Sequence, residues 1–369
     1  MKKIFWLIII GFIQLYPQKT TINNMSPDTT TLKLEKYGTP VIDPYTGSID
    51  EKDSSAVLIK SDRIVQRFST IKLAIESADA NSTIIVYPGT YSDSLTITTE
   101  NITIKGISNG SVTISGAVYV TASRGRIETC TLTGNLTLIG QTAKALYYIK
   151  DCHLENNINV GTASTPITSN ALFIDCLLGK DAAWTTKTIY INKNGSGGPD
   201  ILFNQCYGPV WIDSHNLYID GYSKVTINGG TKLVFHSITI NGGTGFDKVP
   251  SLYFNNMETG IMNLTLNGWT EIACESSRII FYSSGSTISN HCELDLFNCF
   301  IGGATSLNIN FNSSLPSRFT HCTGTTNILA IIGTGLANLH IQHSLFQQPN
   351  APIGLGSDDT NTWGAWVDY

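Results

Sequence analysis

The chain has 369 residues, of which 41% are hydrophobic and 14% are charged, and its formal net charge is -5. The hydrophobic content is sufficient for a substantial core, which argues against a disordered chain. Lys and Arg are few and dispersed, so the sequence lacks the basic stripe that nucleic-acid binding requires, and we expect no nucleic-acid partner. Gly, Ser, Thr and Asn supply most polar positions instead, as in a turn-rich all-β protein.

The first predicted element, residues 1–17, is signal-like. A basic start is followed by the apolar run 4–16, which is shorter than the roughly 20 residues that a membrane-spanning helix needs. No small-residue cleavage site follows this run. A cleaved signal peptide, an uncleaved anchor and a buried N-terminal arm therefore all stay open.

Residues 18–62 are rich in Thr, Pro, Asp and Ser. This composition predicts an extended arm or a small attachment region. We expect other virion or cell-surface proteins to contact the chain through it.

A short helix is predicted next, in the stretch FSTIKLAIESADA. Its apolar residues recur at i, i+3, i+4 and i+7: Ile71, Ala74, Ile75 and Ala78. Ser69 is the expected N-cap, with Phe68 and Leu73 placed for a hydrophobic staple. A corner at Pro88-Gly89 follows, and short strands begin after it. A helix in this position would close the open end of a stack of strands, which otherwise exposes a sheet edge and an apolar core.

A repeat then runs through most of the chain. Six segments read apolar, any, polar, cysteine, and three more end the same frame in Ser or Met. The nine end residues are Cys130, Cys152, Cys176, Cys206, Ser237, Met257, Cys299, Cys322 and Ser344. The steps between them are 22, 24, 30, 31, 20, 42, 23 and 22 residues, and the 42 is most simply two periods. Short alternating strands with glycine turns lie between them, so residues 63–347 are predicted to form a solenoid of stacked coils.

In a solenoid, residues one period apart lie above each other. The nine end residues are therefore predicted to form an inward structural ladder, each thiol contributing on the order of 1 kcal/mol by burial. The sequence has no CxxC pair and no zinc-site spacing, so we expect neither a metal site nor a cofactor.

The stretch TIKLAIESADANSTIIVYPGTYSDSLTITTENITIKG, residues 70–106, resembles the entry segment of the pectin-lyase-like superfamily, which includes pectate lyases, pectin methylesterases and many bacteriophage tailspikes. Beyond residue 106 the resemblance is one of repeat pattern, to about residue 347. It implies an all-β, right-handed, single-stranded parallel β-helix solenoid with an N-terminal capping helix. Function does not follow, because this fold serves enzymes, adhesins and inert spikes.

Four carboxylates are the candidates for polysaccharide cleavage. Asp213 and Asp220 lie in YGPVWIDSHNLYIDGYSK, and Glu293 and Asp295 share one face of a predicted strand by the period of two. Hydrolysis needs two carboxylates about 5 to 10 Å apart, which on a solenoid come from neighbouring coils. The motifs of pectin methylesterases are absent from the sequence.

The same stretch supplies the candidates for glycan contact: Trp211, Asp213, His215 and Tyr222. An aromatic side chain beside carboxylates is suited to holding a sugar. The alternative is an ordinary surface strand that ends in an Asp-Gly turn. His321 and His343 precede ladder residues and are expected to hydrogen-bond within the stack.

After the last repeat, residues 348–369 lose the period and end in aromatic residues, among them Trp363 and Trp366. They are predicted to form a C-terminal cap or tail, or to pack against another subunit in a homotrimer.

Three functional classes remain. The first is a non-enzymatic virion-type structural or attachment protein, such as a phage spike, tail fibre or decoration subunit, that binds host surface polysaccharide. The second is a secreted polysaccharide lyase or hydrolase, and the third is a bacterial surface adhesin. The corresponding locations are the virion surface, the extracellular space and the cell envelope.

Overall fold

The structure is a computed structural model of the chain. It describes residues 56–59, 65–108, 110–122, 124–140, 146–162, 164–165, 167, 170–180, 187–193, 200–208, 213–221, 223–230, 233–242, 249–281, 287–288, 292–303, 306–311, 317–324, 327–332, 338–346, 353–357 and 364–368. The chain divides into two compact units, Met1–Asp50 and Glu51–Tyr369. All described residues belong to the second unit, and the signal-like segment 1–17 lies outside them.

The described residues of this unit form four sheets. Sheet A has 15 strands, in the order β2 (Val65–Phe68), β1 (Ala56–Ile59), β3 (Thr83–Val86), β6 (Ile102–Gly106), β9 (Gly125–Glu128), β12 (Leu146–Lys150), β15 (Asn170–Ile174), β18 (Asp200–Asn204), β20 (Lys224–Asn228), β22 (Ser251–Asn255), β24 (Thr270–Glu275), β27 (Cys292–Phe297), β30 (Ser317–Thr320), β33 (Asn338–Gln342) and β36 (Gly364–Asp368). Sheet B has five, β16 (Leu177–Leu178), β13 (His153–Leu154), β10 (Thr131–Leu132), β7 (Val112–Ile114) and β4 (Gly89–Tyr91).

Sheet C has 13 strands. They are β34 (Leu345–Phe346), β31 (Thr323–Gly324), β28 (Phe300–Gly303), β25 (Arg278–Phe281), β23 (Glu258–Asn267), β21 (Leu233–Asn241), β19 (Asp213–Gly221), β17 (Thr188–Lys193), β14 (Ile158–Val160), β11 (Leu136–Leu138), β8 (Val118–Val120) and β5 (Leu95–Ile97), with β26 (Thr287–Ile288) paired to β23. Sheet D contains β29 (Ser306–Phe311), β32 (Asn327–Ile332) and β35 (Ile353–Ser357).

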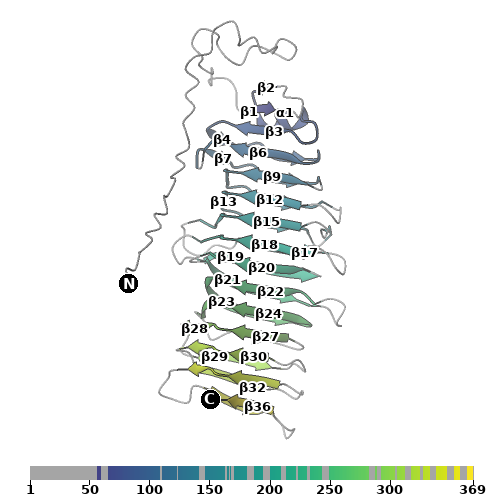
Figure 1. The fold of residues 1–369 in the computed structure, drawn as a ribbon. Coiled ribbons are helices and arrows are strands. Elements are labelled where there is room, and N and C mark those ends of the chain that lie inside the picture. Colours follow the sequence, from purple (N-terminus) through teal and green to yellow (C-terminus); the bar gives the residue numbers. More distant parts are fainter. Residues whose placement is uncertain are drawn as a thin grey trace, which may run out of the picture. The chain divides into compact units, whose positions relative to one another are not determined.

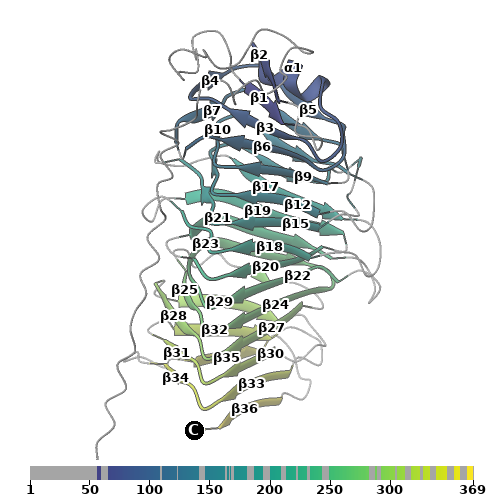
Figure 2. The same cartoon turned by 45° about the horizontal axis from the view of Figure 1, so that its top comes forward.

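The predicted solenoid is confirmed as a parallel β-solenoid. From β3 onward each strand of sheet A pairs in parallel with the equivalent strand of the next coil (Figure 1). Sheet C follows the same rule, and Figure 2 shows β17, β19, β21 and β23 side by side. Among the described strands, only β1 runs antiparallel to its two neighbours, β2 and β3.

In-register stacking builds the core from columns of like residues. Ile127, Ile149, Phe173 and Phe203 occupy equivalent positions in β9, β12, β15 and β18, and all four are buried. The rings of Phe173 and Phe203 stack with centroids 4.6 Å apart and planes 9° apart. The alternating pattern of the short strands therefore places one apolar column inside and one polar column outside.

The polar residue before each ladder position has a structural reason. These residues have φ between 49° and 62°, in the left-handed region: Thr129, Asp151, Asp175, Gln205, Asn256, Ser276, Asn298, His321 and His343. Asn, Asp and His tolerate this region better than most side chains. The conformation turns the chain out of sheet A and aims the backbone N–H at the next coil, as from Asp151 to the carbonyl of Ile174 at 3.0 Å.

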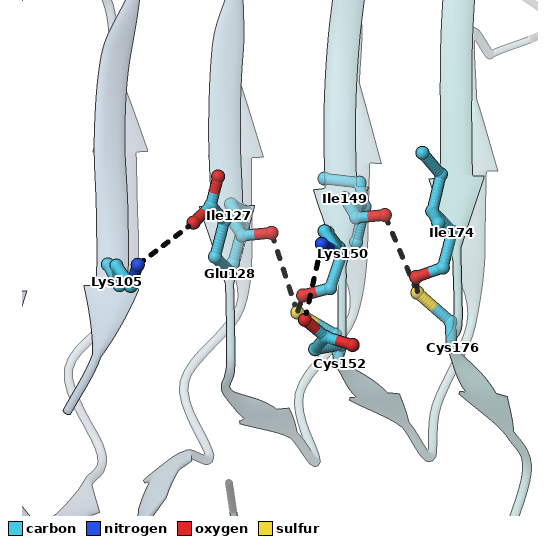
Figure 3. Close-up of polar contacts among 9 residues, drawn as sticks. Lys105, Ile127, Glu128, Ile149, Lys150, Cys152, Ile174 and Cys176 are labelled. Atoms are coloured by element: carbon cyan, nitrogen blue, oxygen red, sulfur yellow. Dashed lines mark hydrogen bonds and ion pairs between the residues drawn. The ribbon is translucent and has the colours of Figure 1, made fainter. Parts of the chain in front are cut away.

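The ladder thiols lie at the ends of the strands, where carbonyl groups need partners (Figure 3). The Cys152 sulfur lies 3.2 Å from the carbonyl oxygen of Lys150 and 3.5 Å from that of Ile127 in the preceding coil. Ser344 makes the equivalent contact with a hydroxyl, 2.9 Å from the carbonyl oxygen of Gln342. Cys and Ser both supply a small side chain with one donor, which explains why these two residues exchange at such positions.

The seven cysteines whose side chains the structure describes are free and buried: Cys130, Cys152, Cys176, Cys206, Cys274, Cys299 and Cys322. Burial raises the pKa of the Cys130 thiol to about 12 and raises the pKa of Cys152 and Cys274 as well. These three thiols are therefore neutral at physiological pH, and unreactive as nucleophiles.

The predicted ladder differs from the structure at Ser237. This residue lies in β21 of sheet C, opposite Asn216 and Asn263, and the position above Cys206 is held by Gly230. A Cβ on Gly230, whose φ is +102°, would collide with the carbonyl oxygen of Cys206, so no side chain fits there. The prediction failed because a glycine leaves no ladder residue to recognise.

The 42-residue step also resolves into two coils. Cys274 takes the apolar place of the frame, opposite Phe254 and Leu296, and Ser277 takes the ladder place. The Ser277 hydroxyl lies 2.8 Å from the carbonyl oxygen of Glu275, as a ladder residue should. The two-period interpretation is confirmed, with Ser277 as the rung that the cysteine frame overlooked.

The predicted helix is present as α1 (Ile71–Glu76), and its residues Ile71, Ala74 and Ile75 are buried. Its N-cap is Thr70, not Ser69. Thr70 has the extended backbone that a cap requires, and its hydroxyl accepts a hydrogen bond from the backbone N–H of Leu73 at 3.1 Å. In the described part of the chain, no helix is long and apolar enough to cross a membrane.

Candidate functional site

His215, one of the predicted glycan contacts, is completely buried. Its Nε2 lies 2.9 Å from the carbonyl oxygen of Asn156, and its Nδ1 is buried without a hydrogen-bond partner. Burial lowers the pKa of His215 to about 4, so the ring is neutral at physiological pH. The register between β19 and β21 is irregular around this residue, which breaks the simple alternation. His215 is a core residue, and the prediction that it contacts a glycan is wrong.

Of the other predicted contacts, the structure describes only some. Trp211 and Tyr222 lie outside the described residues. Asp213 begins β19, and only its backbone is described. Asp220, near the other end of the same strand, faces outward and is half-buried. Asp220 is therefore the candidate residue around which a site can be built.

Two tyrosines that the sequence analysis did not select stand beside Asp220. Tyr190 in β17 pairs with Tyr218 in β19, and their rings stack with centroids 5.2 Å apart and planes 19° apart. The neighbouring outward column contains Asn192, Asp220 and Asn241, paired in register across β17, β19 and β21. We call these five residues the tyrosine ledge.

Hydrogen bonds hold the ledge in place. The Asn192 side-chain amide donates to the Tyr190 hydroxyl at 3.2 Å and to the carbonyl oxygen of Thr162 at 3.1 Å. The Asn241 amide donates to the Tyr218 hydroxyl. Burial, together with the nearby charge of Asp220, raises the pKa of both tyrosines, so the phenols stay protonated and can act as donors.

The outward column that carries the two ledge tyrosines is uncharged. The outward column that contains Tyr190 and Tyr218 continues in both directions through Thr96, Tyr119, Thr137, Asn159, Thr239 and Thr265. Neighbouring rungs are bonded to each other, as in the 3.3 Å hydrogen bond from Asn159 to Thr137. A ligand on this face would meet hydroxyl and amide groups, with Asp220 as the single charge in the ledge.

The candidate catalytic carboxylates fall on two different sheets. Asp213 and Asp220 belong to β19 of sheet C, whereas Glu293 and Asp295 belong to β27 of sheet A. The structure therefore does not bring the two pairs together. Each pair shares one strand, whereas a catalytic pair on a solenoid is expected from neighbouring coils.

One of these carboxylates has an unusual environment. Asp295 lies 3.6 Å from Arg318, but burial, opposed by Arg318 and reinforced by the charge of Glu271, raises its pKa. Its Oδ1 is buried without a hydrogen-bond partner. Glu271, in the preceding coil, accepts a hydrogen bond from the Tyr253 hydroxyl at 2.8 Å. Glu293 pairs with Glu271 along the backbone, and its side chain lies outside the described set.

No protein-family model, curated protein or solved structure matches the chain. Within the described residues, no group of three or more His, Cys, Asp or Glu side chains could hold a metal ion. The site therefore has to be judged from its own geometry.

A signal for the ledge does exist in the sequence. Tyr190-Ile191-Asn192 and Tyr218-Ile219-Asp220 repeat the same outward, inward, outward pattern one coil apart. The cysteine frame marks only the strands of sheet A, so a search centred on it passes over this second repeat.

Proposed function

We propose that this chain is a non-enzymatic, virion-type attachment protein: a spike, fibre or decoration subunit that presents its β-solenoid to a host surface glycan. We further propose that the solenoid is right-handed, belongs to the pectin-lyase-like type, and is closed at its N-terminal end by α1. The glycan would lie on the tyrosine ledge. The observation that carries this proposal is the stacked pair Tyr190 and Tyr218 with polar side chains locked beside it.

The chemistry of the ledge suits a sugar. Hydroxyl groups both donate and accept hydrogen bonds, and the ledge offers phenol donors, amide groups and the Asp220 carboxylate within two adjacent columns. The edges of the two rings supply apolar contact for the C–H groups of a sugar. Because Asp220 is ionised when it accepts, its hydrogen bond to a sugar hydroxyl would be the strongest of the set.

The solenoid supports the ledge rigidly. Each ledge strand is bonded along its length to a strand on either side, and the ledge side chains are bonded to one another. Little conformational entropy is then lost on binding, which favours a shallow site that would otherwise bind weakly. A stiff stack of coils is also the property that an attachment rod needs.

The test is a screen of the purified chain against bacterial and plant polysaccharides, recording both binding and the release of new reducing or unsaturated ends. Binding without turnover is expected. Tyr218→Ala should weaken binding by about tenfold or more, which corresponds to about 1.4 kcal/mol. Tyr119→Ala is the matched control, because Tyr119 lies in the same column but away from the ledge. Equal weakening by both variants, or the absence of any binding, would refute the ledge proposal.

A secreted polysaccharide lyase or hydrolase is the second candidate, and Asp295 is the observation that favours it. A carboxyl group with a raised pKa near a carboxylate from the preceding coil is an arrangement used for general acid catalysis. Turnover in the screen that is lost in Asp295→Asn would establish this function. A bacterial surface adhesin would bind in the same way, and locating the chain in particles or in cell envelopes distinguishes it from a virion protein.

A further inference from the structure

A groove follows the corner where the chain leaves sheet A at the left-handed turns. It has a volume of about 470 Å³ and is lined by Asn256, Glu258, Arg278, Asn298, Phe300 and His321, with Gly230 at one end and Thr323 at the other. We call it the corner groove. Its lining residues come from successive coils, so its long direction follows the stacking axis of the coils.

The walls of the corner groove are built by specific contacts. Arg278 forms a 3.0 Å ion pair with Glu258 in the preceding coil, and its guanidinium lies 5.1 Å from the centre of the Phe300 ring in the next. The Asn298 side-chain amide donates to the Ser276 hydroxyl at 3.3 Å. Each of these contacts joins neighbouring coils, so the wall is fixed before any ligand arrives.

Histidine closes one end of the groove. The His321 ring stacks on His343 with centroids 5.1 Å apart, and Phe297 meets it edge-on at 5.7 Å. From the sequence, the side chains of His321 and His343 were expected to hydrogen-bond within the coil stack. The structure shows that the two rings are held by stacking. The hydrogen bond that joins His321 to the next coil comes from its backbone N–H, which donates to Gln342 at 3.0 Å.

We infer that the corner groove is a second ligand site, which binds an extended, uncharged oligosaccharide lying along the solenoid axis. The elongated shape favours a chain over a compact ligand. The charges of Glu258 and Arg278 offset each other at 3.0 Å, so a free anion or cation would first have to break that pair. Planar donors and acceptors beside an aromatic ring match the alternating hydroxyl and C–H surfaces of a sugar.

The same corner is hollowed again in the earlier coils. A second hollow of about 320 Å³ is lined by Asp151, His153, Asp175 and Tyr207, among others. Tyr207 follows Cys206, and Cys206 lies opposite Gly230 in the next coil, so the two hollows end in adjacent coils. A path along one corner is suited to a polymer longer than a single hollow.

The experiment titrates the full chain with maltohexaose, cellohexaose and chitohexaose by calorimetry. At least one hexasaccharide should bind, and Arg278→Gln and Phe300→Ala should each weaken it by about tenfold or more. Arg318→Gln is the matched control, since Arg278 and Arg318 are both 55% exposed and both pair with a carboxylate of the preceding coil. Circular dichroism verifies that each variant is folded.

Two further variants and ligands separate this site from the ledge. Tyr218→Ala should leave hexasaccharide binding within about twofold, and the corresponding trisaccharide should bind at least about tenfold more weakly because it spans fewer coils. The inference is wrong if no hexasaccharide binds at millimolar concentration, if Arg318→Gln weakens binding as much as Arg278→Gln, or if Tyr218→Ala abolishes it. The last result would leave the ledge proposal intact and remove only the corner groove.

Discussion

Two outward columns, one in the first coils of sheet A and one in sheet C, solve the same stacking problem in different ways. In sheet A, Lys105, Glu128 and Lys150 lie in register in three successive coils, and Lys105 and Glu128 form a 3.6 Å ion pair (Figure 3). In sheet C, the column that contains Asp220 continues through Asn241 and Asn267, whose side-chain amides are bonded at 2.9 Å. The first column alternates its charges, whereas the second, from Asn192 to Asn267, has Asp220 as its single charge. Farther along sheet A, Asn204, Asn228 and Asn255 form a neutral amide ladder of the same kind.

The difference follows from the spacing of the coils. Parallel strands stack about 4.8 Å apart, so an in-register column places like residues within contact distance. Identical charges would repel at that distance, whereas opposite charges attract and neutral amides bond to each other. A charged column interacts with water and salt, but a neutral column leaves a surface on which sugar hydroxyls meet matching groups. We therefore place the proposed ligand site on sheet C, at the tyrosine ledge.

The two sheets cover the same core, and we expect a substitution in this core to cause the largest loss in the free energy of unfolding. Phe173→Ala removes a buried ring that stacks on Phe203, and we expect a loss of about 3–5 kcal/mol in the free energy of unfolding. Leu172→Ala, at the adjacent outward position, should cost less than about 1 kcal/mol. Denaturant unfolding measures both. Similar losses for the two variants would mean that the core is not packed as described.

We expect acid to destabilise the protein at His215, a buried residue of sheet C. Burial lowers the pKa of His215 from 6.5 to about 4. Between these two pH values the ring is protonated in the unfolded chain and neutral in the folded chain. The stability contributed by the neutral ring is complete above pH 6.5 and is lost as the pH falls toward 4, by about 3 kcal/mol in total. His215→Gln should flatten this part of the pH profile, measured by unfolding at each pH. An unchanged profile would contradict the assignment.

Reversing one charge should break the alternation in sheet A. Glu128→Lys places three lysines in register, and we expect a loss of about 0.5–1 kcal/mol that is largely recovered at about 1 M salt. Glu128→Gln, which removes the attraction without adding repulsion, should cost less. Unfolding at low and high salt provides the comparison. A loss that salt does not relieve would indicate a packing defect.

The smallest effect is expected on the neutral face. Asn267→Ala removes an exposed amide that is bonded to Asn241, and the cost should be about 0.5 kcal/mol or less. Because neither partner is charged, the same cost should be measured at low and at high salt. A salt-dependent cost would show that the contrast between the two faces is not electrostatic.

The sequence predicted the solenoid because one short frame repeats at the point where every coil turns. Each frame carries an apolar residue for the core, a polar residue for the left-handed turn and a small residue for the strand end, and all three requirements are local. The prediction missed two ladder positions, Gly230 and Ser277. At these rungs the backbone requirement is met without a cysteine, so residue identity gives no signal.

The candidate site was predicted much less well. The stretch that includes His215 and Asp220 was selected for its composition, yet the register places His215 in the core and Asp220 outside. Tyr190 and Tyr218 lie 28 positions apart in the sequence but stack at 5.2 Å. The two segments resemble each other, but their likeness does not fix the register that pairs the rings, because coil length varies between coils.

The sequence by itself determined that this chain forms stacked β coils with a thiol-rich interior, because the repeating frame encodes the turn, the core and the strand end within a few residues. Only the tertiary structure decided which outward residues become neighbours. Which residues become neighbours depends on the number of residues in the loops of each coil, because the loops set the register between strands that are far apart in the sequence. The ledge and the corner groove are products of that register.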